Sequence, residues 1–287
     1  MTEAKTLTKN QPPTHDGTPT TYQRWNLQHR LQHGVLAIST GGLLWTGLAI
    51  KFHYVEWAQM TFRIFGGFHG NLIAHKVFAT LLVLVSVWHL IYLAVGWRKL
   101  GFSMGMVPTF KDLEDSWHHM LYLLNLRQKP PQYDRYSYLE KFEYLAIFWG
   151  MFVMGGTGFA LWFPTIAGQW VPRVWLDGFR IVHSNEAVVA VITLAYGHIF
   201  NAHLNPSIFP SNPVWLTGKI SLEHMMEEHP LEYQQLVEKG ILPAPPHEGH
   251  HEGRLAGWRR WVAAFELIIY SAIFYYLLVT FIPLLLA

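Results

Sequence analysis

Long uncharged runs of apolar residues dominate the chain. Five of them approach or reach the roughly 20 apolar residues that a helix needs to cross a bilayer, where no water can satisfy the backbone. They span residues 31–50, 78–95, 144–163, 187–202 and 267–287. The second run extends back towards Asn71, and the fourth is expected to begin near Ile181. The pattern predicts an all-α integral membrane bundle with five transmembrane helices.

The polar segments between these runs divide the chain into four parts. Residues 1–30 are polar and rich in proline, which predicts a loosely held N-terminal tail without a cleavable signal peptide. Residues 31–205 form the predicted four-helix core, including the polar loop 96–143. Residues 206–260 form a polar segment and linker, and residues 261–287 hold the fifth predicted helix.

Lysine and arginine are distributed unequally between the two predicted membrane sides. Sixteen lie in the tail, the loop 96–143 and the segment 201–260, whereas four lie in the two remaining loops. Because positively charged loops stay in the cytoplasm, this predicts a cytoplasmic N-terminus and a C-terminus outside. We expect a bacterial or archaeal cytoplasmic (inner) membrane.

Composition narrows the chemistry that such a bundle can carry. Only 14% of the residues are charged, against about a quarter in soluble domains. The chain has no cysteine, which excludes an iron–sulfur cluster, a covalently attached c-type haem and a thiolate zinc site. A formal net charge of +2 with scattered basic residues argues against nucleic-acid binding. Any metal must therefore be held by nitrogen or oxygen.

Histidine is the other anomaly, with 17 residues in the chain and several inside predicted helices. A polar imidazole in hydrocarbon is costly and by default marks a functional site. His75 and His89 are 14 residues apart, and His183 and His198 are 15 apart, close to four helical turns. Each pair therefore lies near one face of its helix, and the two helices run parallel. Facing imidazoles at two depths predict two b-type haems, each iron held from both sides.

The order of motifs along the chain also resembles a known family. Arg30-Leu-Gln-His33 is followed by Thr46-Gly47, His75, Thr157-Gly158, His183, His198-Ile-Phe, Gly218-Lys-Ile-Ser and Glu228-His-Pro-Leu-Glu-Tyr233. Over about residues 22–236 the chain is similar to the di-haem cytochrome b (gamma) subunit of membrane-bound formate dehydrogenases. The same superfamily includes the cytochrome b subunits of nickel–iron hydrogenases and thiosulfate reductases.

This resemblance implies an electron-transfer subunit of an oxidoreductase complex. It would link an external redox subunit, which carries haems or iron–sulfur clusters, to the quinone pool as menaquinone or ubiquinone. It also implies that His75 and His183 hold the outer haem and that His33 and His198 hold the inner one. The spacing alone, which resembles the cytochrome b of bc-type complexes, would assign the inner haem to His89 and His198. We favour His33 because its sequence context matches the family.

Three features depart from that family: His89, His203 and the fifth span. The imidazole that the inner haem does not use could bind quinone, relay protons, or join His203 at a third haem. Arg30 and Asn201 are candidates to contact quinone or a haem propionate. The loop 96–143 adds an acidic and imidazole-rich cluster able to carry protons: Asp112, Glu114, Asp115, His118 and His119.

Three other functions compete with this interpretation. A proton or ion transporter that uses histidine relays would contain no haem. A haem protein that passes electrons to a non-quinone acceptor would not be reduced by quinol. A membrane metalloenzyme is disfavoured because the sequence has no HExxH motif and no carboxylate within the predicted spans suited to be a general base.

Overall fold

The computed structural model describes residues 20–100, 105–204 and 212–244, together with positions 268, 271 and 275. These residues fall into two compact units. The bundle unit contains residues 28–99, 145–204 and 212, and the second unit contains residues 20–27, 100, 105–144 and 213–244. The fifth predicted helix, 267–287, lies almost wholly outside the described residues.

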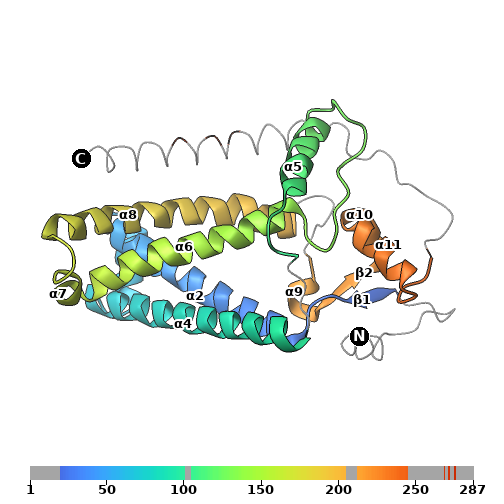
Figure 1. The fold of residues 1–287 in the computed structure, drawn as a ribbon. Helices are drawn as coiled ribbons and strands as arrows, with labels where there is room; N and C mark the ends of the chain where they lie inside the picture. Colours follow the sequence, from blue (N-terminus) through green and yellow to red (C-terminus); the bar gives the residue numbers. More distant parts are fainter. Residues whose placement is uncertain are drawn as a thin grey trace. The chain divides into compact units, whose positions relative to one another are not determined.

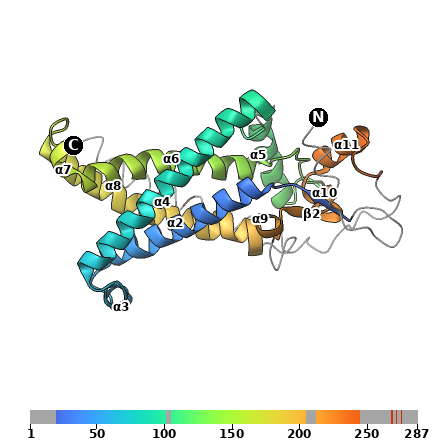
Figure 2. The same ribbon diagram turned by 90° about the horizontal axis from the view of Figure 1, so that it is seen from below.

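Four long helices form the bundle, and the two views show them side by side (Figures 1 and 2). They are α2 (Leu27–Lys51), α4 (Phe68–Val95), α6 (Tyr138–Trp162) and α8 (Arg173–Ile192). The π-helical segments η2 (Gly96–Leu100) and η3 (Thr193–Leu204) continue α4 and α8. All four are long and apolar enough to cross a membrane. Their outward faces carry exposed apolar side chains such as Phe152, which suits contact with lipid. Four of the five predicted spans are therefore confirmed.

These helices begin earlier than the uncharged runs predict. The expected start near Ile181 is wrong, because α8 begins at Arg173, and α6 begins at Tyr138 rather than residue 144. A charged residue interrupts a run of apolar residues, but a helix can continue through that residue at the membrane surface. At α6 the start is set by a capping box, in which Ser137 Oγ accepts from the Glu140 amide and Glu140 Oε2 accepts from the Ser137 amide.

Two short helices connect the spans of the bundle unit. They are α3 (Glu56–Ile64) and α7 (Pro164–Ala167). The Trp45 indole on α2 donates a hydrogen bond of 3.1 Å to Thr61 Oγ1 on α3, which fixes α3 to the bundle. Gly67 has φ +103°, so the turn from α3 into α4 uses a backbone conformation that favours glycine.

The second unit is built around a two-stranded sheet. Strand β1 (Thr21–Gln23) pairs antiparallel with β2 (Lys219–Ser221), with Tyr22 opposite Ile220. Its helices are α5 (Phe110–Leu123), α9 (Val214–Thr217), α10 (Leu222–Glu228) and α11 (Pro230–Glu238). The buried apolar core comprises Tyr22, Val214, Ile220, Leu222, Met225, Tyr233, Leu236 and Leu242. Residues 21–23 and 27–30, expected to belong to a loose tail, instead form β1 and the first turn of α2.

A buried ion network joins three parts of this unit. Glu232 accepts from Arg24 Nη1 at 2.9 Å and from Arg135 Nη1 at 2.7 Å, and Arg135 Nη2 donates to the Arg24 carbonyl at 2.9 Å. Removing one partner of such a buried pair is costly because a charge is left uncompensated. The Glu228–Tyr233 motif therefore serves this network.

Neutral His229 also belongs to this buried cluster. Its Nδ1 lies 2.8 Å from the Asp134 carbonyl, so Nδ1 carries the hydrogen and donates. Burial, reinforced by the Arg24 guanidinium, lowers the pKa of His229 to about 3. In the unfolded chain the pKa of histidine is about 6.5. Folding therefore holds His229 in its neutral form throughout the acidic range between these two values.

We predict that the second unit loses stability as the pH falls from about 6.5 towards about 3. In that window the unfolded chain binds a proton that the folded unit excludes, which costs up to about 1.4 kcal/mol per pH unit. Hydrogen-exchange protection of residues 213–244, corrected for intrinsic rates, measures the effect. His229→Gln should weaken the dependence without abolishing it, because burial also lowers the pKa of His119 to about 4. Unchanged wild-type protection across the window would contradict the prediction.

Candidate functional site

His75 on α4 is held in one orientation by the dipeptide Thr46-Gly47 on α2. Thr46 Oγ1 lies 2.8 Å from His75 Nδ1, and the same hydroxyl lies 2.7 Å from the Gly42 carbonyl, to which it donates. Because the hydroxyl hydrogen is used in that bond, Oγ1 accepts from Nδ1–H. The Nε2 atom of His75 then carries the lone pair that a metal requires.

Gly47 provides the space that the His75 ring occupies. A Cβ atom built at Gly47 would lie 3.0 Å from His75 Cε1, closer than most side-chain contacts. Asn71 on α4 donates to the Thr46 carbonyl at 3.1 Å and joins the two helices at the same level. Threonine and glycine thus act together, one orienting the ring and the other making room for it.

The same arrangement recurs at His183 on α8, supported by Thr157-Gly158 on α6. Thr157 Oγ1 lies 3.0 Å from His183 Nδ1 and donates to the Val153 carbonyl at 2.6 Å. A Cβ atom at Gly158 would lie 3.0 Å from His183 Cε1. His183 therefore also has its Nδ1 engaged and its Nε2 available as a ligand.

The two supported histidines face each other. Their ring centroids lie 6.3 Å apart with an interplanar angle of 75°. Two metal–nitrogen bonds of about 2 Å, with about 1 Å from each nitrogen to its ring centre, would place the centroids roughly 6 Å apart. The pair formed by His75 and His183 thus has the separation needed to bind one metal ion from opposite sides.

A second pair lies nearer the start of α2. The centroids of His33 and His198 are 6.1 Å apart at an angle of 51°. His203 lies beside the same pair, with its centroid 6.4 Å from that of His198. Since Thr46 and His33 are 13 residues apart on α2, the two pairs are separated by about 20 Å along that helix.

His89 contacts α2 through the side chain that precedes His33. Its Nδ1 is 2.8 Å from Gln32 Oε1. The structure brings His33 against His198. The spacing argument for His89 assumed a regular α-helix between His183 and His198, whereas π-helical turns begin at Thr193 and change the direction of later side chains.

The surroundings of the two pairs fit a large, partly anionic ligand. Arg30 Nε is buried without a hydrogen-bond partner among the described residues, one turn before His33 on α2. A buried guanidinium donor of this kind suits a carboxylate, such as a haem propionate. Within the described ranges, no group of three or more histidine, aspartate or glutamate side chains could hold a metal ion together. Facing imidazoles suit the ligation of a macrocycle iron from both sides, and His75 and His183 each keep Nε2 available for it.

Seven glycines along α2 and α6 differ in what they face: Gly41, Gly42, Gly47, Gly150, Gly155, Gly156 and Gly158. Gly47 and Gly158 face the histidine rings, and a Cβ at Gly42 would meet the Phe78 ring. The remaining glycines of the set have nothing within 4 Å of such a Cβ: Gly41, Gly150, Gly155 and Gly156. Only two of the set thus serve the histidines directly.

Glu186 is a buried carboxylate inside the fourth span, which was expected to begin near Ile181. It lies in α8 with 7% of its surface exposed. It stands one residue before the uncharged run 187–202. Its place in the helix sequence His183-Ser-Asn-Glu186 was the available signal.

The predicted proton-carrying cluster of the loop lies in the second unit, where several of its members have other partners. Lys141 Nζ lies 2.7 Å from Asp112 Oδ1, and Lys111 Nζ lies 2.5 Å from Asp115 Oδ2. His119 Nδ1 lies 2.8 Å from the Tyr138 hydroxyl. Asp112 also caps α5 through Thr109. These contacts give the cluster a structural role.

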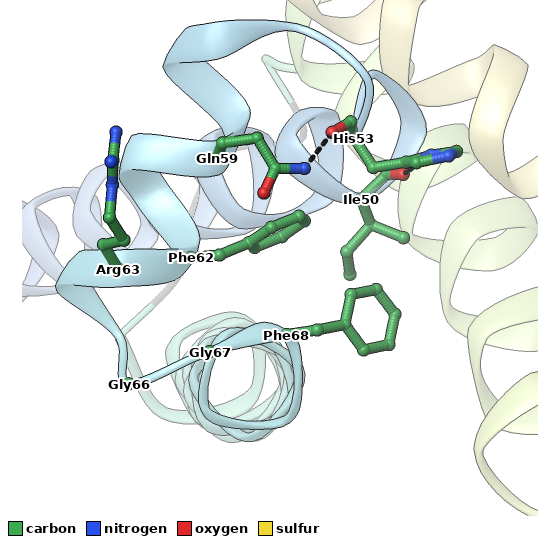
Figure 3. Close-up of a pocket in the computed structure, with 8 residues that line it drawn as sticks. All are labelled: Ile50, His53, Gln59, Phe62, Arg63, Gly66, Gly67 and Phe68. Atoms are coloured by element: carbon green, nitrogen blue, oxygen red, sulfur yellow. Dashed lines mark hydrogen bonds between the residues drawn. The ribbon is translucent and has the colours of Figure 1, made fainter.

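A cavity of about 870 Å³ opens at the end of α2, between α3 and the first turn of α4 (Figure 3). Its lining is Ile50, His53, Gln59, Phe62, Arg63, Gly66, Gly67 and Phe68. Gln59 Nε2 donates to the His53 carbonyl across its rim, and Phe62 and Phe68 form its apolar floor. Neither the histidines of the two pairs nor His89 and His203 line this cavity.

Comparison with known families identifies the class of protein to which the chain belongs. The family model of prokaryotic cytochrome b561 matches residues 24–210, which include all four described spans and both histidine pairs. The chain belongs to the prokaryotic cytochrome b561 family. A search of curated proteins finds no significant match. This membership confirms the resemblance to a cytochrome b subunit.

As a member of the cytochrome b561 family, the chain is an integral membrane protein that binds b-type haem and transfers electrons. The observations above are consistent with this cofactor: paired imidazoles at metal-binding separation, glycines that admit the rings and an orphaned guanidinium nitrogen. The transporter without haem is thereby set aside.

We predict that Gly158→Ala lowers haem occupancy about 10-fold at the site of His183. The new methyl group would lie 3.0 Å from Cε1 of His183 and displace the ring, and outer-shell changes at metal ligands typically cost 10- to 100-fold in affinity. Gly155→Ala on the same helix is the matched control, because its Cβ meets nothing within 4 Å. Haem absorbance per purified chain measures both variants. Equal haem contents would contradict the role assigned to Gly158.

Proposed function

We propose that the chain carries two b-type haems, one held by His75 and His183 and the other by His33 and His198. The observation that supports this is the pair of imidazole contacts, 6.3 Å and 6.1 Å between ring centroids, on the same set of spans. Two centres about 20 Å apart along α2 can carry electrons from one membrane face towards the other.

The distribution of lysine and arginine supports the direction assigned to these centres. With the N-terminus of α2 in the cytoplasm, His33 lies towards the cytoplasmic side and Thr46, with its partner His75, towards the outside. The outer centre would then exchange electrons with an external subunit carrying haems or iron–sulfur clusters. The inner centre would exchange them with the quinone pool.

The residues of the chain perform the positioning that this function requires. Bound haem would supply reversible one-electron chemistry at iron. Thr46 and Thr157 fix the Nδ1–H tautomers of His75 and His183, so that each Nε2 is aimed at the position between the rings. The lipid-facing apolar side chains keep water from the histidines, which preserves a low local polarity.

The quinone site is proposed near the inner centre. Arg30 and Asn201 both lie on the spans that carry His33 and His198, three residues before His33 and three after His198. Arg30 Nε, buried and without a partner among the described residues, can donate to a quinone carbonyl or to a propionate. Asn201 can both donate and accept. His203, beside His198, is the candidate to pass a proton to bound quinone.

We predict that His75→Ala removes one of two haems and leaves the other. The variant keeps Thr46, His33 and His198, so the inner site retains both ligands. His89→Ala on the same helix is the control and should keep both haems, because His89 contacts Gln32. Haem extraction and reduced-minus-oxidised spectra of the purified chain give the stoichiometry.

Loss of both haems or of neither from His75→Ala would contradict the assigned layers. Loss of a haem from His89→Ala would instead favour His89 as the ligand opposite His198. Reduction of the inner haem by a quinol in the native complex tests whether the inner centre exchanges electrons with quinone. Failure of that reduction would leave the haem sites standing and reject quinone.

A further inference from the structure

Glu186 is a carboxylate buried within a transmembrane span. It lies on α8 with 7% of its surface exposed. Its Oε2 atom is buried and has no hydrogen-bond partner among the described residues. An ionisable side chain at such a position is costly to keep, so a functional role is the default explanation.

Glu186 lies on the same face of α8 as His183. Residues three apart on a helix share a face, and one step of three residues rises about 4.5 Å. The two buried residues of α8 are Glu186 and Val189, which continue the row that starts at His183. Glu186 therefore projects into the bundle, one turn further from the start of α8 than the ligand of the outer centre.

The neighbouring spans bring three cationic or titratable groups to this level of α8. Lys51 of α2 lies 2.7 Å from Asn185 Oδ1 and 3.3 Å from Ser184 Oγ, and forms no ion pair with Glu186 among the described residues. From α4 come His75, which faces His183, and Lys76, whose Nζ lies 5.3 Å from the Trp162 ring. From α6 come the uncharged Thr157 and Gly158.

An unpaired buried carboxylate is held at a high free-energy cost unless a positive charge stands near it. The iron centre between His75 and His183 would carry one more positive charge when oxidised than when reduced. Glu186 thus has its strongest electrostatic support in the oxidised state. Removing that positive charge with an electron leaves the neutral acid as the less costly form.

We propose that Glu186 binds a proton when the outer centre is reduced and releases it on reoxidation, so that electron and proton move together at this level of the membrane. One electron arrives from the external redox partner or from the inner centre. One proton adds to a carboxylate oxygen of Glu186, forming an O–H bond. Reoxidation returns both. The inference rests on the proposed function, because it requires a haem at the site of His75 and His183.

Redox titration of the purified, haem-loaded full chain at a series of pH values tests the proposal. In the wild type, the midpoint potential of the outer haem should fall as the pH rises, by up to about 59 mV per tenfold fall in proton concentration. Glu186→Gln should make it independent of pH, whereas Glu186→Asp retains the acid and the dependence. Asp177→Asn is the matched control, because this carboxylate of α8 is exposed and pairs with Arg180.

Infrared difference spectra between the reduced and oxidised states provide a readout independent of activity. A carboxylic acid C=O band should form on reduction of the wild type and be absent from Glu186→Gln. A pH-independent wild-type potential, or a pH dependence and band retained in Glu186→Gln, would overturn the proposal. If Glu186→Gln fails to bind haem, the pH dependence of the midpoint potential in the wild type and in Glu186→Asp still tests the proposal. Absence of the outer haem from the wild type would instead reject the proposed function.

Discussion

The hydrogen bond from imidazole Nδ1 to a threonine hydroxyl is the interaction on which the outer site depends. Inside a bilayer no water can satisfy the second nitrogen of a histidine, so the protein must supply a partner. At His75 and at His183 the partner is a hydroxyl whose own hydrogen is already used by its helix backbone. That single choice sets the tautomer, orients the ring and leaves Nε2 for a metal. The adjacent glycine is then necessary, because the histidine ring occupies the space that a side chain at the glycine position would fill.

In the second unit, a few contacts hold together segments that are far apart in the sequence. Its apolar core is small, and the strand segments contribute three residues each. The buried carboxylate of Glu232 joins Arg24 and Arg135, which are 111 residues apart in the sequence. Such a network favours one arrangement of these segments because any other would leave a charge unpaired.

Much of the architecture can be predicted from the sequence because a bilayer imposes a simple length rule on apolar segments. The same rule explains the errors. The expected start near Ile181 follows the charged Arg180, although α8 continues back through Arg180 and Asp177 to Arg173. The histidine spacing predicted imidazole pairs at two levels, but it assumed regular α-helix where η3 is π-helical.

The choice between His33 and His89 as neighbour of His198 depended on tertiary contacts that spacing does not contain. Gln32 engages His89, and this contact joins residues 57 positions apart. The Thr46-Gly47 and Thr157-Gly158 motifs can be recognised in the sequence. Their hydrogen bonds to His75 and His183 become evident only when the facing helices are placed side by side. The buried network of Glu232 was hidden for the same reason, since its members Arg24, Arg135 and Glu232 lie far apart in the sequence.

The central claim, that paired imidazoles bind two irons axially, is tested most directly by the haem content and electron paramagnetic resonance spectrum of the purified, oxidised full chain. The account predicts two haems per chain, both in the low-spin state typical of iron with two imidazole ligands. A single haem per chain, or a high-spin signal that shows an open axial position, would contradict it.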